Sequence, residues 1–438
     1  MSTVRNPWVW VPTLYFAEGI PYVVVNNISV IMLKRMGMAN GDVALFTGLL
    51  YLPWFIKPLW SPFVDILRTK RWWTVTMQLL MAVAFAALVA VLPSPSPDEI
   101  AAGGVSVSPF IATLVIFWIT AFASATHDIA ADGFYMLALT QEQQSFFVGI
   151  RSTFYRLASI FGQGALVLVA GLLESSTGNI PLSWRLTFVI TAVIFGAVAL
   201  YHTFALPKPV SDAARVHAGG TGERAREIVS EIGRAFVSFF KKKQIWAAMA
   251  FMLLFRLPEA FLVKIMNLFL LDPVGAGGLG LSTKAVGIVY GTAGVAALTV
   301  GGILGGMAAS KWGLKKVLWP MALSLALPCS VFLYLAIAQP QNIWVTGSCV
   351  VLDQFGYGFG FTAYMLYLIM FSEGEFKTVH YSICTAFMAL SMMLPGMVAG
   401  YLQEWLGYVD FFWMVMVCCA VTVLVTLCIK VDPEFGKS

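Results

Sequence analysis

The chain has 438 residues, of which 59% are hydrophobic and only 11% are charged, and its mean hydropathy is +0.82. A soluble domain carries about 25% charged residues, so this composition excludes a soluble globular protein. The net charge of +5 comes without a basic motif interleaved with aromatic residues, so we expect no nucleic-acid partner. Continuous apolar runs predict membrane-spanning α-helices, because the strands of a β-barrel would show alternation instead.

Twelve apolar segments are long enough to cross a bilayer. They extend over residues 9–32, 43–64, 72–92, 109–139, 146–172, 184–206, 244–271, 283–309, 317–338, 343–371, 378–402 and 408–430. The first segment has no small-residue cleavage site after a short apolar core, so we expect a transmembrane helix there and no signal peptide. The sequence therefore predicts an all-α membrane protein with twelve transmembrane helices.

The longest polar stretch separates the sixth segment from the seventh and predicts two halves. We expect a six-helix bundle over 1–206, a linker with an amphipathic helix over 207–243, and a second six-helix bundle over 244–438. A weak repeat relates LYFAEGIPYVVVNN (14–27) to LFRLPEAFLVKIMN (254–267), which brings Glu18 and Glu259 to comparable positions. Two parallel six-helix halves are the architecture of the major facilitator superfamily, in which the substrate site lies near the midplane between the halves.

The distribution of Lys and Arg predicts the orientation in the membrane. If the N-terminus is cytoplasmic, the inside segments hold 18 basic residues and the outside loops hold 4. Basic residues are concentrated in cytoplasmic loops. We therefore expect both termini and the central linker to face the cytoplasm.

Ten ionisable side chains fall at membrane depth, five of each sign. A charge at the bilayer centre costs at least about 2.5–3.5 kcal/mol on insertion scales, so these groups must face one another or a water-filled cavity. The acids are Glu18, Asp128, Asp132, Glu259 and Asp353. The bases are Lys57, Arg151, Arg156, Arg256 and Lys264.

The segment ATHDIAADGF (125–134) concentrates these polar groups. Asp128 and Asp132 are four residues apart and share a helix face, and we expect Arg151 and Arg156 on the next helix to be their counterions. Either the four form a static network that holds helices together, or one carboxylate exchanges its partner for a proton during transport. His127 lies on a different face of the helix. It is expected to pack by hydrogen bonding, with proton relay and substrate contact as alternatives, and no metal site is expected.

Glycine and proline interrupt the first and seventh segments in comparable places, around Glu18 and beside Glu259. Interrupted helices in matching positions of two halves indicate a binding site, whereas simple proline kinks are the alternative. The five acids are the candidates for proton coupling or a charge network. The candidates for substrate binding are Lys57, Arg151, Arg156, Arg256, Asn26, Asn27, His127, Tyr357 and Tyr364. The candidates for a gating loop are Asp65, Arg68 and Arg71.

Several segments resemble the AmpG-type muropeptide permeases, a group within the major facilitator superfamily that also includes acetyl-CoA transporters. They are GIPYVVV (19–25), LPWFIKPLWSPFVD (52–65), SATHDIAADGF (124–134) and DQFGYGFGFTAYMLYL (353–368). The resemblance implies functional roles for Lys57, Asp65, Asp128 and Asp132. His127 departs from the pattern, since that family usually has Gln at this position.

The resemblance implies a proton-coupled secondary transporter of the bacterial inner membrane, which imports anhydro-muropeptides or a related glycan by alternating access. A transporter of acetyl-CoA or another acidic metabolite is the alternative, and a membrane-embedded enzyme is a distant one. An enzyme would need a nucleophile beside a base or a His-rich metal cluster, and the four histidines form no HExxH motif. We expect a monomer without cofactors, whose partners are the lipid bilayer, protons and a glycopeptide or oligosaccharide substrate.

Overall fold

The computed structural model describes residues 6–209, 212, 230, 233–433 and 435, and the regular structure of these residues is helical. The helices of the first half are η1 (Pro7–Val9), α1 (Val11–Val23), η2 (Val24–Ile28), α2 (Ser29–Arg35), α3 (Asn40–Leu49), α4 (Leu52–Ile56), η3 (Lys57–Leu59), α5 (Ser61–Leu67), α6 (Lys70–Val91), α7 (Pro97–Ala102), η4 (Ser108–Phe110), α8 (Ile111–Ala138), α9 (Gln141–Ile160), η5 (Phe161–Leu166), α10 (Val167–Thr177) and α11 (Ile180–Ala205). Those of the second half are α13 (Ile245–Leu254), α14 (Leu257–Leu271), η6 (Val274–Ala276), α15 (Thr283–Val286), η7 (Gly287–Gly294), α16 (Val295–Trp312), α17 (Leu314–Ala326), η8 (Leu327–Cys329), α18 (Ser330–Ala338), α19 (Ile343–Ser372) and α20 (Lys377–Cys428).

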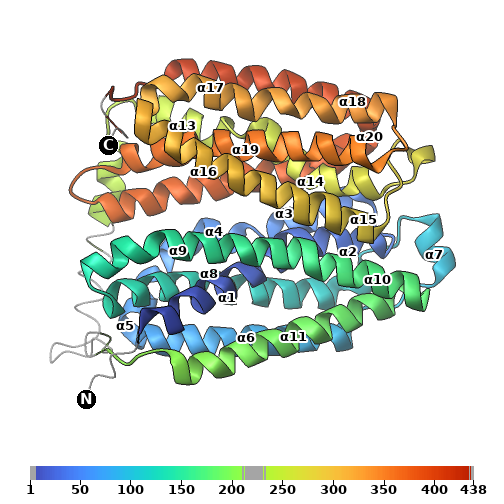
Figure 1. Cartoon of the computed structure of the whole chain (residues 1–438), viewed down its shortest axis with the longest axis horizontal. Helices are drawn as coiled ribbons and strands as arrows, with labels where there is room; N and C mark the ends of the chain where they lie inside the picture. Colours follow the sequence, from blue (N-terminus) through green and yellow to red (C-terminus); the bar gives the residue numbers. More distant parts are fainter. Residues whose placement is uncertain (1–5, 210–211, 213–229, 231–232, 434, 436–438) are drawn as a thin grey trace.

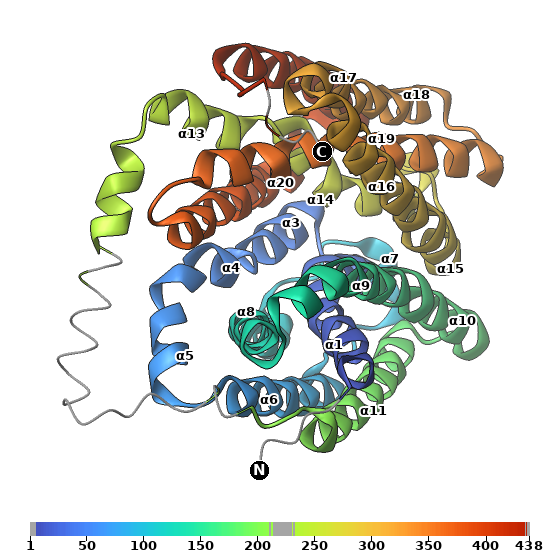
Figure 2. The ribbon, with the colours of Figure 1, turned by 60° about the vertical axis from the view of Figure 1, so that its left-hand side comes forward.

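The two halves form two bundles that lie side by side. Figure 1 shows one bundle above the other, with the longest axis of the molecule horizontal, and Figure 2 shows α6, α8 and α11 in one bundle and α16, α17 and α19 in the other. The short helix α7 lies at one end of the molecule, here called the α7 end. The described chain begins and ends at the opposite end, here called the termini end.

The twelve predicted spans are confirmed, although two of them are less regular than expected. Within the described residues, ten helices are long and apolar enough to cross a membrane, and the last of these, Val379–Cys428, turns at Gly407, where φ is 76°. The second predicted span is broken into α3, α4, η3 and α5. A proline in the first turn begins each of the last three, because proline suits a helix start but disrupts a helix interior.

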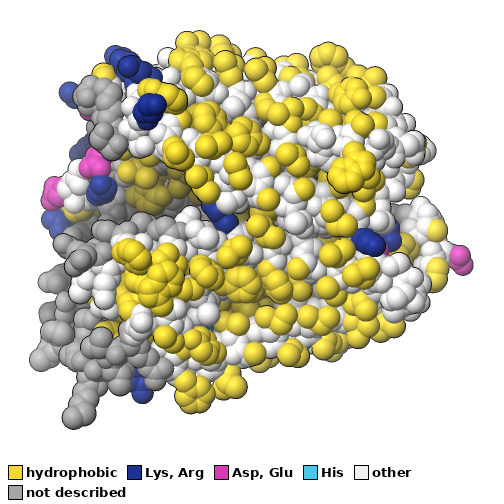
Figure 3. All heavy atoms as spheres, viewed as in Figure 1, with side chains coloured by type: hydrophobic (Ala, Val, Ile, Leu, Met, Phe, Trp, Pro, Cys, Tyr) yellow, Lys and Arg dark blue, Asp and Glu magenta, His cyan; other side chains and the backbone are white. Residues whose placement is uncertain are grey.

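The surface of the molecule has the distribution expected of a protein embedded in lipid. Figure 3 shows hydrophobic side chains over the flanks of both bundles, with Lys, Arg, Asp and Glu gathered at the two ends. Figure 3 also shows a recess between the bundles, with Lys or Arg atoms inside it. Apolar flanks between charged ends match the hydrocarbon core and the polar interfaces of a bilayer.

The helices that were predicted to be interrupted are indeed irregular. Pro21 lies inside α1, and the chain continues as the π-helical segment η2. In the second half, α13 ends at Leu254 and α14 begins at Leu257, with Pro258 in its first turn. Both irregularities lie next to the centre of the molecule, where they position Asn27 and Arg256 on a cavity described below.

The linker predicted over 207–243 lies mostly outside the described residues, and its described part is helical at residues 233–240. Asp212 accepts hydrogen bonds from the backbone N–H groups of Lys70, at 2.7 Å, and Arg71, at 2.9 Å. Burial is the largest influence on the Asp212 carboxyl and raises its pKa, while these N–H groups act in the opposite direction. The start of the linker thus caps α6.

The residue bounds that the sequence predicts for the two halves and for the linker stay a prediction.

Candidate functional site

A cavity of about 440 Å³ lies between the two bundles. Its walls come from both of them, from α1, α4 and α9 on one side and from α14, α19 and α20 on the other. Aromatic and amide side chains dominate the lining, and charged side chains are few. The aromatic residues are Tyr22, Tyr51, Trp54, Tyr155, Tyr290, Tyr357 and Phe361. The amides are Asn27, Gln163 and Gln354, and the charged residues are Lys57, Arg256 and Glu259.

Both cations of the cavity are already paired with carboxylates. Lys57, in η3, forms an ion pair with Asp128 of α8. Arg256 donates from Nε to one oxygen of Glu259 at 2.7 Å and from Nη2 to the other at 2.8 Å, and it also donates to the Tyr357 hydroxyl at 2.9 Å. A fork of this kind fixes the guanidinium plane. The cavity is therefore polar and aromatic but nearly balanced in charge.

The acidic segment of α8 forms a cluster with α1 and α9. Arg151 pairs with Asp132 at 2.7 Å, and the Tyr15 hydroxyl donates to the same carboxylate at 3.0 Å. The guanidinium of Arg151 also lies 4.4 Å from the centre of the Tyr15 ring. Glu18 is buried within electrostatic range of Asp128 and Asp132. Its Oε2 atom has no hydrogen-bond partner among the described residues.

This cluster contains three carboxylates, Glu18, Asp128 and Asp132, and two cations, Lys57 and Arg151. One carboxylate therefore lacks a counter-charge. Three like-signed groups at such close range repel one another, so the charge is best balanced when the cluster also holds a proton. The arrangement suits a group of side chains that exchanges a proton.

Arg156 does not join this cluster, although the sequence suggested that it would. Its guanidinium crosses to the second bundle, where Nη1 donates weakly to the Thr299 carbonyl oxygen at 3.4 Å and packs against Gly302. No carboxylate pairs with Arg156 in the part of the chain that the structure describes. It lies one residue after Tyr155, which lines the cavity.

His127 lies away from the cavity, in a buried chain of hydrogen bonds. The Gln78 amide nitrogen donates to His127 Nε2 at 2.9 Å, and the Gln78 amide oxygen accepts from His202 Nδ1 at 2.9 Å. His202 Nε2 lies 2.9 Å from the Thr13 hydroxyl. The chain ties α8, α6, α11 and α1 together. The packing role expected for His127 fits this geometry, whereas a direct contact with substrate does not.

Three other candidates lie apart from the cavity wall. Asn26 is buried and donates to the Tyr22 carbonyl oxygen at 3.1 Å, while its neighbour Asn27 reaches the cavity. Asp353 accepts from Gln354 at 3.0 Å, so Gln354, and not the acid, faces the cavity. The Tyr364 hydroxyl donates to the Met252 carbonyl oxygen at 2.6 Å. Tyr357 is the residue of this helix that reaches both the cavity and Arg256.

The predicted gating residues lie at the termini end, from the last helix of the second span to the start of α6. Arg71 donates to the carbonyl oxygens of Thr203 and Leu206, at the end of α11. The guanidinium of Arg68 lies 5.6 Å from the centre of the Trp72 ring. Asp65 belongs to α5, and its side chain is outside the described part of the structure. The described contacts join elements of the first bundle, so a gating role for these residues stays a prediction.

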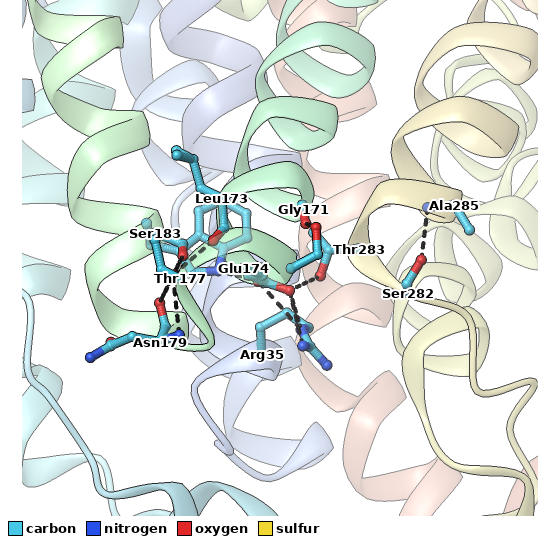
Figure 4. A network of polar contacts seen from close by, with 12 residues as sticks. Arg35, Gly171, Leu173, Glu174, Thr177, Asn179, Ser183, Ser282, Thr283 and Ala285 are labelled. Atoms are coloured by element: carbon cyan, nitrogen blue, oxygen red, sulfur yellow. Dashed lines mark hydrogen bonds and ion pairs between the residues drawn. The ribbon is translucent and has the colours of Figure 1, made fainter.

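Polar contacts close the α7 end of the interface between the bundles. Figure 4 shows Glu174, in α10, which accepts from Arg35 at 2.9 Å and, from the second bundle, from the Thr283 hydroxyl at 2.7 Å. A second group forms around Asp272, which pairs with Lys34 and accepts from Asn40 at 2.9 Å. Nothing in the sequence pattern singled out these residues, because they lie at the ends of spans, where polar residues are common.

Comparison with known proteins agrees with this architecture. The model of the Major Facilitator Superfamily matches residues 13–375. The anhydromuropeptide permease of Escherichia coli K12 is 24% identical over 422 residues, which cover 94% of this chain and 77% of that one. A putative transporter, AmpG 4, of Rickettsia conorii is 24% identical over 427 residues, which cover 96% of each chain.

Solved structures show the same fold at lower identity. A D-xylose–proton symporter has a TM-score of 0.72 and 12% identity, and the match covers 98% of this chain and 99% of that one. The nucleoside transporter NupG has a TM-score of 0.68 and 15% identity, with 97% and 98% covered. These matches confirm the predicted transporter fold of two six-helix bundles. The chain belongs to the Major Facilitator Superfamily, whose members are secondary transporters.

Proposed function

We propose that this protein imports cell-wall-derived sugar–peptide fragments, anhydro-muropeptides or a related glycan, together with protons across the bacterial inner membrane. The single observation that supports this most is the cavity between the bundles, with aromatic walls, amide groups and paired charges. Aromatic faces pack against the apolar faces of sugar rings, and a few well-placed polar groups orient a ligand in such a pocket. The match to a permease named for anhydromuropeptides supports the same substrate class.

A strongly anionic metabolite such as acetyl-CoA suits this cavity less well. Phosphate groups are bound by cations that are free to hydrogen bond with them. Lys57 and Arg256, the cations among the described lining residues, each have a carboxylate partner. Arg156, beside the lining residue Tyr155, is the cation that we assign to an acidic group of the substrate, such as a peptide carboxylate.

The cluster of Glu18, Asp128 and Asp132 is the proposed proton site. Its carboxylates outnumber its cations, and Lys57 belongs both to the cluster and to the cavity wall. A proton on the cluster would loosen the hold of Asp128 on Lys57 and free the ammonium to face the substrate. Proton binding and substrate binding would then favour each other, which is what coupling requires.

The proposed orientation has the termini end in the cytoplasm. Lys and Arg are concentrated at that end, which supports this assignment. We expect a membrane-impermeant thiol reagent to label a cysteine placed at exposed Gly104, at the α7 end, in intact cells. A cysteine placed at exposed Lys311 should be labelled only after the inner membrane is permeabilised, and the reverse pattern would contradict the assignment.

Uptake into proteoliposomes tests the proposed function. Liposomes with an acidic exterior are given a labelled anhydro-muropeptide, with and without a protonophore. We expect accumulation that the protonophore abolishes and that unlabelled muropeptide competes away. Asp98→Asn, which removes an exposed carboxylate of α7 outside the cluster, is the control for Asp128→Asn. Uptake that survives the protonophore would exclude proton coupling, and uptake of acetyl-CoA in place of muropeptide would exclude the substrate class.

A further inference from the structure

Lys264, in α14, is a buried cation that the central cavity does not use. The residue is 2% exposed and follows Val263, which lines the cavity. Its ammonium group donates to the Thr47 hydroxyl at 3.2 Å and lies 5.0 Å from the centre of the Tyr51 ring. Thr47 and Tyr51 belong to the first bundle. Lys264 therefore sits where the two bundles meet, on the α7 side of the cavity.

The surroundings of Lys264 offer no opposite charge among the described residues. From α20, Gly396 packs on the stem, since a Cβ on this glycine would lie 3.2 Å from Lys264 Cγ. From the first bundle, the titratable group that faces the ammonium is Tyr51. On α14 itself, the carboxylate of Glu259 is held by Arg256. The Thr47 hydroxyl and the Tyr51 ring are therefore the polar partners of this ammonium among the described residues.

The burial of Lys264 depends on the conformation of the whole protein. The helices that pack around Lys264 are α3 from the first bundle and α14 and α20 from the second. The same three helices contact one another at the closed α7 end. If the bundles part at that end, water reaches the ammonium. A charged group that is solvated in one conformation and buried without a partner in the other favours the solvated conformation. A proton on Lys264 therefore opposes closure of the α7 end.

We propose that Lys264 is a second proton-binding site of the transport cycle, which takes a proton when the bundles part at the α7 end and releases it when they close. This builds on the proposed proton-coupled transport and adds a group that links protonation to the conformation. In the proposed orientation, the proton comes from outside the cell. The Tyr51 ring, 5.0 Å from the ammonium, also lines the cavity and so connects Lys264 to it.

The distance across the α7 end tests this proposal without any substrate. Spin labels are attached at Ala102→Cys and Ala276→Cys, which lie on opposite bundles and line one pocket at that end, in a variant whose native cysteines are replaced by serine. The distribution of distances is then measured from acidic to alkaline pH. We expect acidification to increase the ratio of open to closed molecules, by at most about tenfold per pH unit for a single proton.

Three variants distinguish Lys264 from other groups. Lys264→Met should keep the α7 end closed and flatten the pH response, and Lys264→Arg should favour the open form at every pH. Lys284→Met, the same change at an exposed lysine of the α7 end, should keep the wild-type response. An unchanged distance distribution across pH in the wild type, or a full response in Lys264→Met, would overturn the proposal. Because no muropeptide is present, neither result depends on the substrate assignment.

Discussion

At the scale of single residues, the ten charges at membrane depth divide by their partners. Three ion pairs form, and they are Lys57–Asp128, Arg151–Asp132 and Arg256–Glu259. Two acids and two bases are without an ion pair among the described residues: Glu18, Asp353, Arg156 and Lys264. The paired groups connect helices to one another, and among the unpaired ones we propose roles for Glu18, Arg156 and Lys264.

The Lys57–Asp128 pair gives the first prediction. Lys57→Met and Asp128→Asn should each lower stability by about 1–3 kcal/mol, because each leaves a charged partner unsatisfied in a partly buried place. The double variant should lose less than the sum of the two, since it leaves no orphan charge. Thermal unfolding of the purified protein in detergent measures this, and strictly additive losses would show that the two side chains do not interact.

Arg156 gives the second prediction. If it receives an acidic group of the substrate, Arg156→Gln should raise the KM for a muropeptide that has a free peptide carboxylate by about 10- to 100-fold, which corresponds to the loss of about 1.5–3 kcal/mol for a charge-assisted hydrogen bond. The maximal rate should change much less, because the lost interaction affects how tightly the substrate binds. The KM for the same sugar without its peptide should stay the same, and an equal rise for both ligands would indicate a structural role.

The sequence identified charged residues far better than it identified their partners. It predicted that Asp128 and Asp132 share a face and that Arg151 and Arg156 are their counterions, and of these pairs the structure has Arg151 with Asp132. Lys57 is predicted to bind substrate, and its partner Asp128, 71 positions away in the sequence, is not predicted. The contact between His127 and Gln78 could not be found, and neither could the cavity tyrosines other than Tyr357. Such residues look like ordinary packing until the helices are placed in space.

At the scale of elements, the two bundles come into close contact through π-helical segments. η5 packs against η7, and both are rich in glycine. A Cβ on Gly291 would lie 1.9 Å from the Gln163 carbonyl oxygen, and one on Gly164 would lie 2.6 Å from the Thr292 hydroxyl oxygen. π-Helical turns inside α-helices are often found at functional sites. Here they let two backbones meet beside the cavity.

Substitution of one glycine tests this contact and is the third prediction. Gly291→Ala should destabilise the present conformation by about 1–3 kcal/mol, the usual cost of overpacking, because the backbone that it meets cannot rotate away. Gly306→Ala, in the following helix, is the matched control, since no atom lies within 4 Å of its Cβ. Thermal unfolding and uptake should both be impaired in the first variant. Equal behaviour of the two would mean that η5 and η7 are not held this closely.

Prolines in the sequence predicted where helices break, but they did not predict the form of each break. The interruptions near Glu18 and Glu259 follow directly from Pro21 and Pro258. The segmented second span was predicted as one helix because its hydropathy is continuous and only the spacing of its prolines signals the breaks. The π-helical turns have no local signal, since they depend on the backbone that packs against them. The amino-acid sequence thus determines where a helix can break, and tertiary contacts determine the type of helical turn that forms there.

At the scale of the whole molecule, the structure represents a single conformation of the transporter, in which the α7 end is closed. Polar contacts join the bundles at the α7 end, and a recess lies between the bundles in Figure 3. Alternating access requires that these contacts break while others form around the same central site. The sequence cannot indicate which conformation is the more stable, because both are built from the same helices.

The contacts at the α7 end give the last prediction, because they should set the balance between the two conformations. Thr283→Val removes the hydroxyl that reaches Glu174 across the interface, and Asn40→Ala removes the donor to Asp272 and Gln403. Together these changes should weaken the closed form by about 1–3 kcal/mol, which is about 5- to 150-fold in the ratio of open to closed molecules.

Spin labels at Ala102→Cys and Ala276→Cys would report this change directly. Thr177→Val is the matched control, since the Thr177 hydroxyl bonds only within the first bundle among the described residues, to Leu173, Asn179 and Ser183 (Figure 4). It should leave the distance distribution unchanged. If the double variant also leaves it unchanged, the bundles are held together at the α7 end by apolar packing, and the polar contacts serve only to satisfy buried groups.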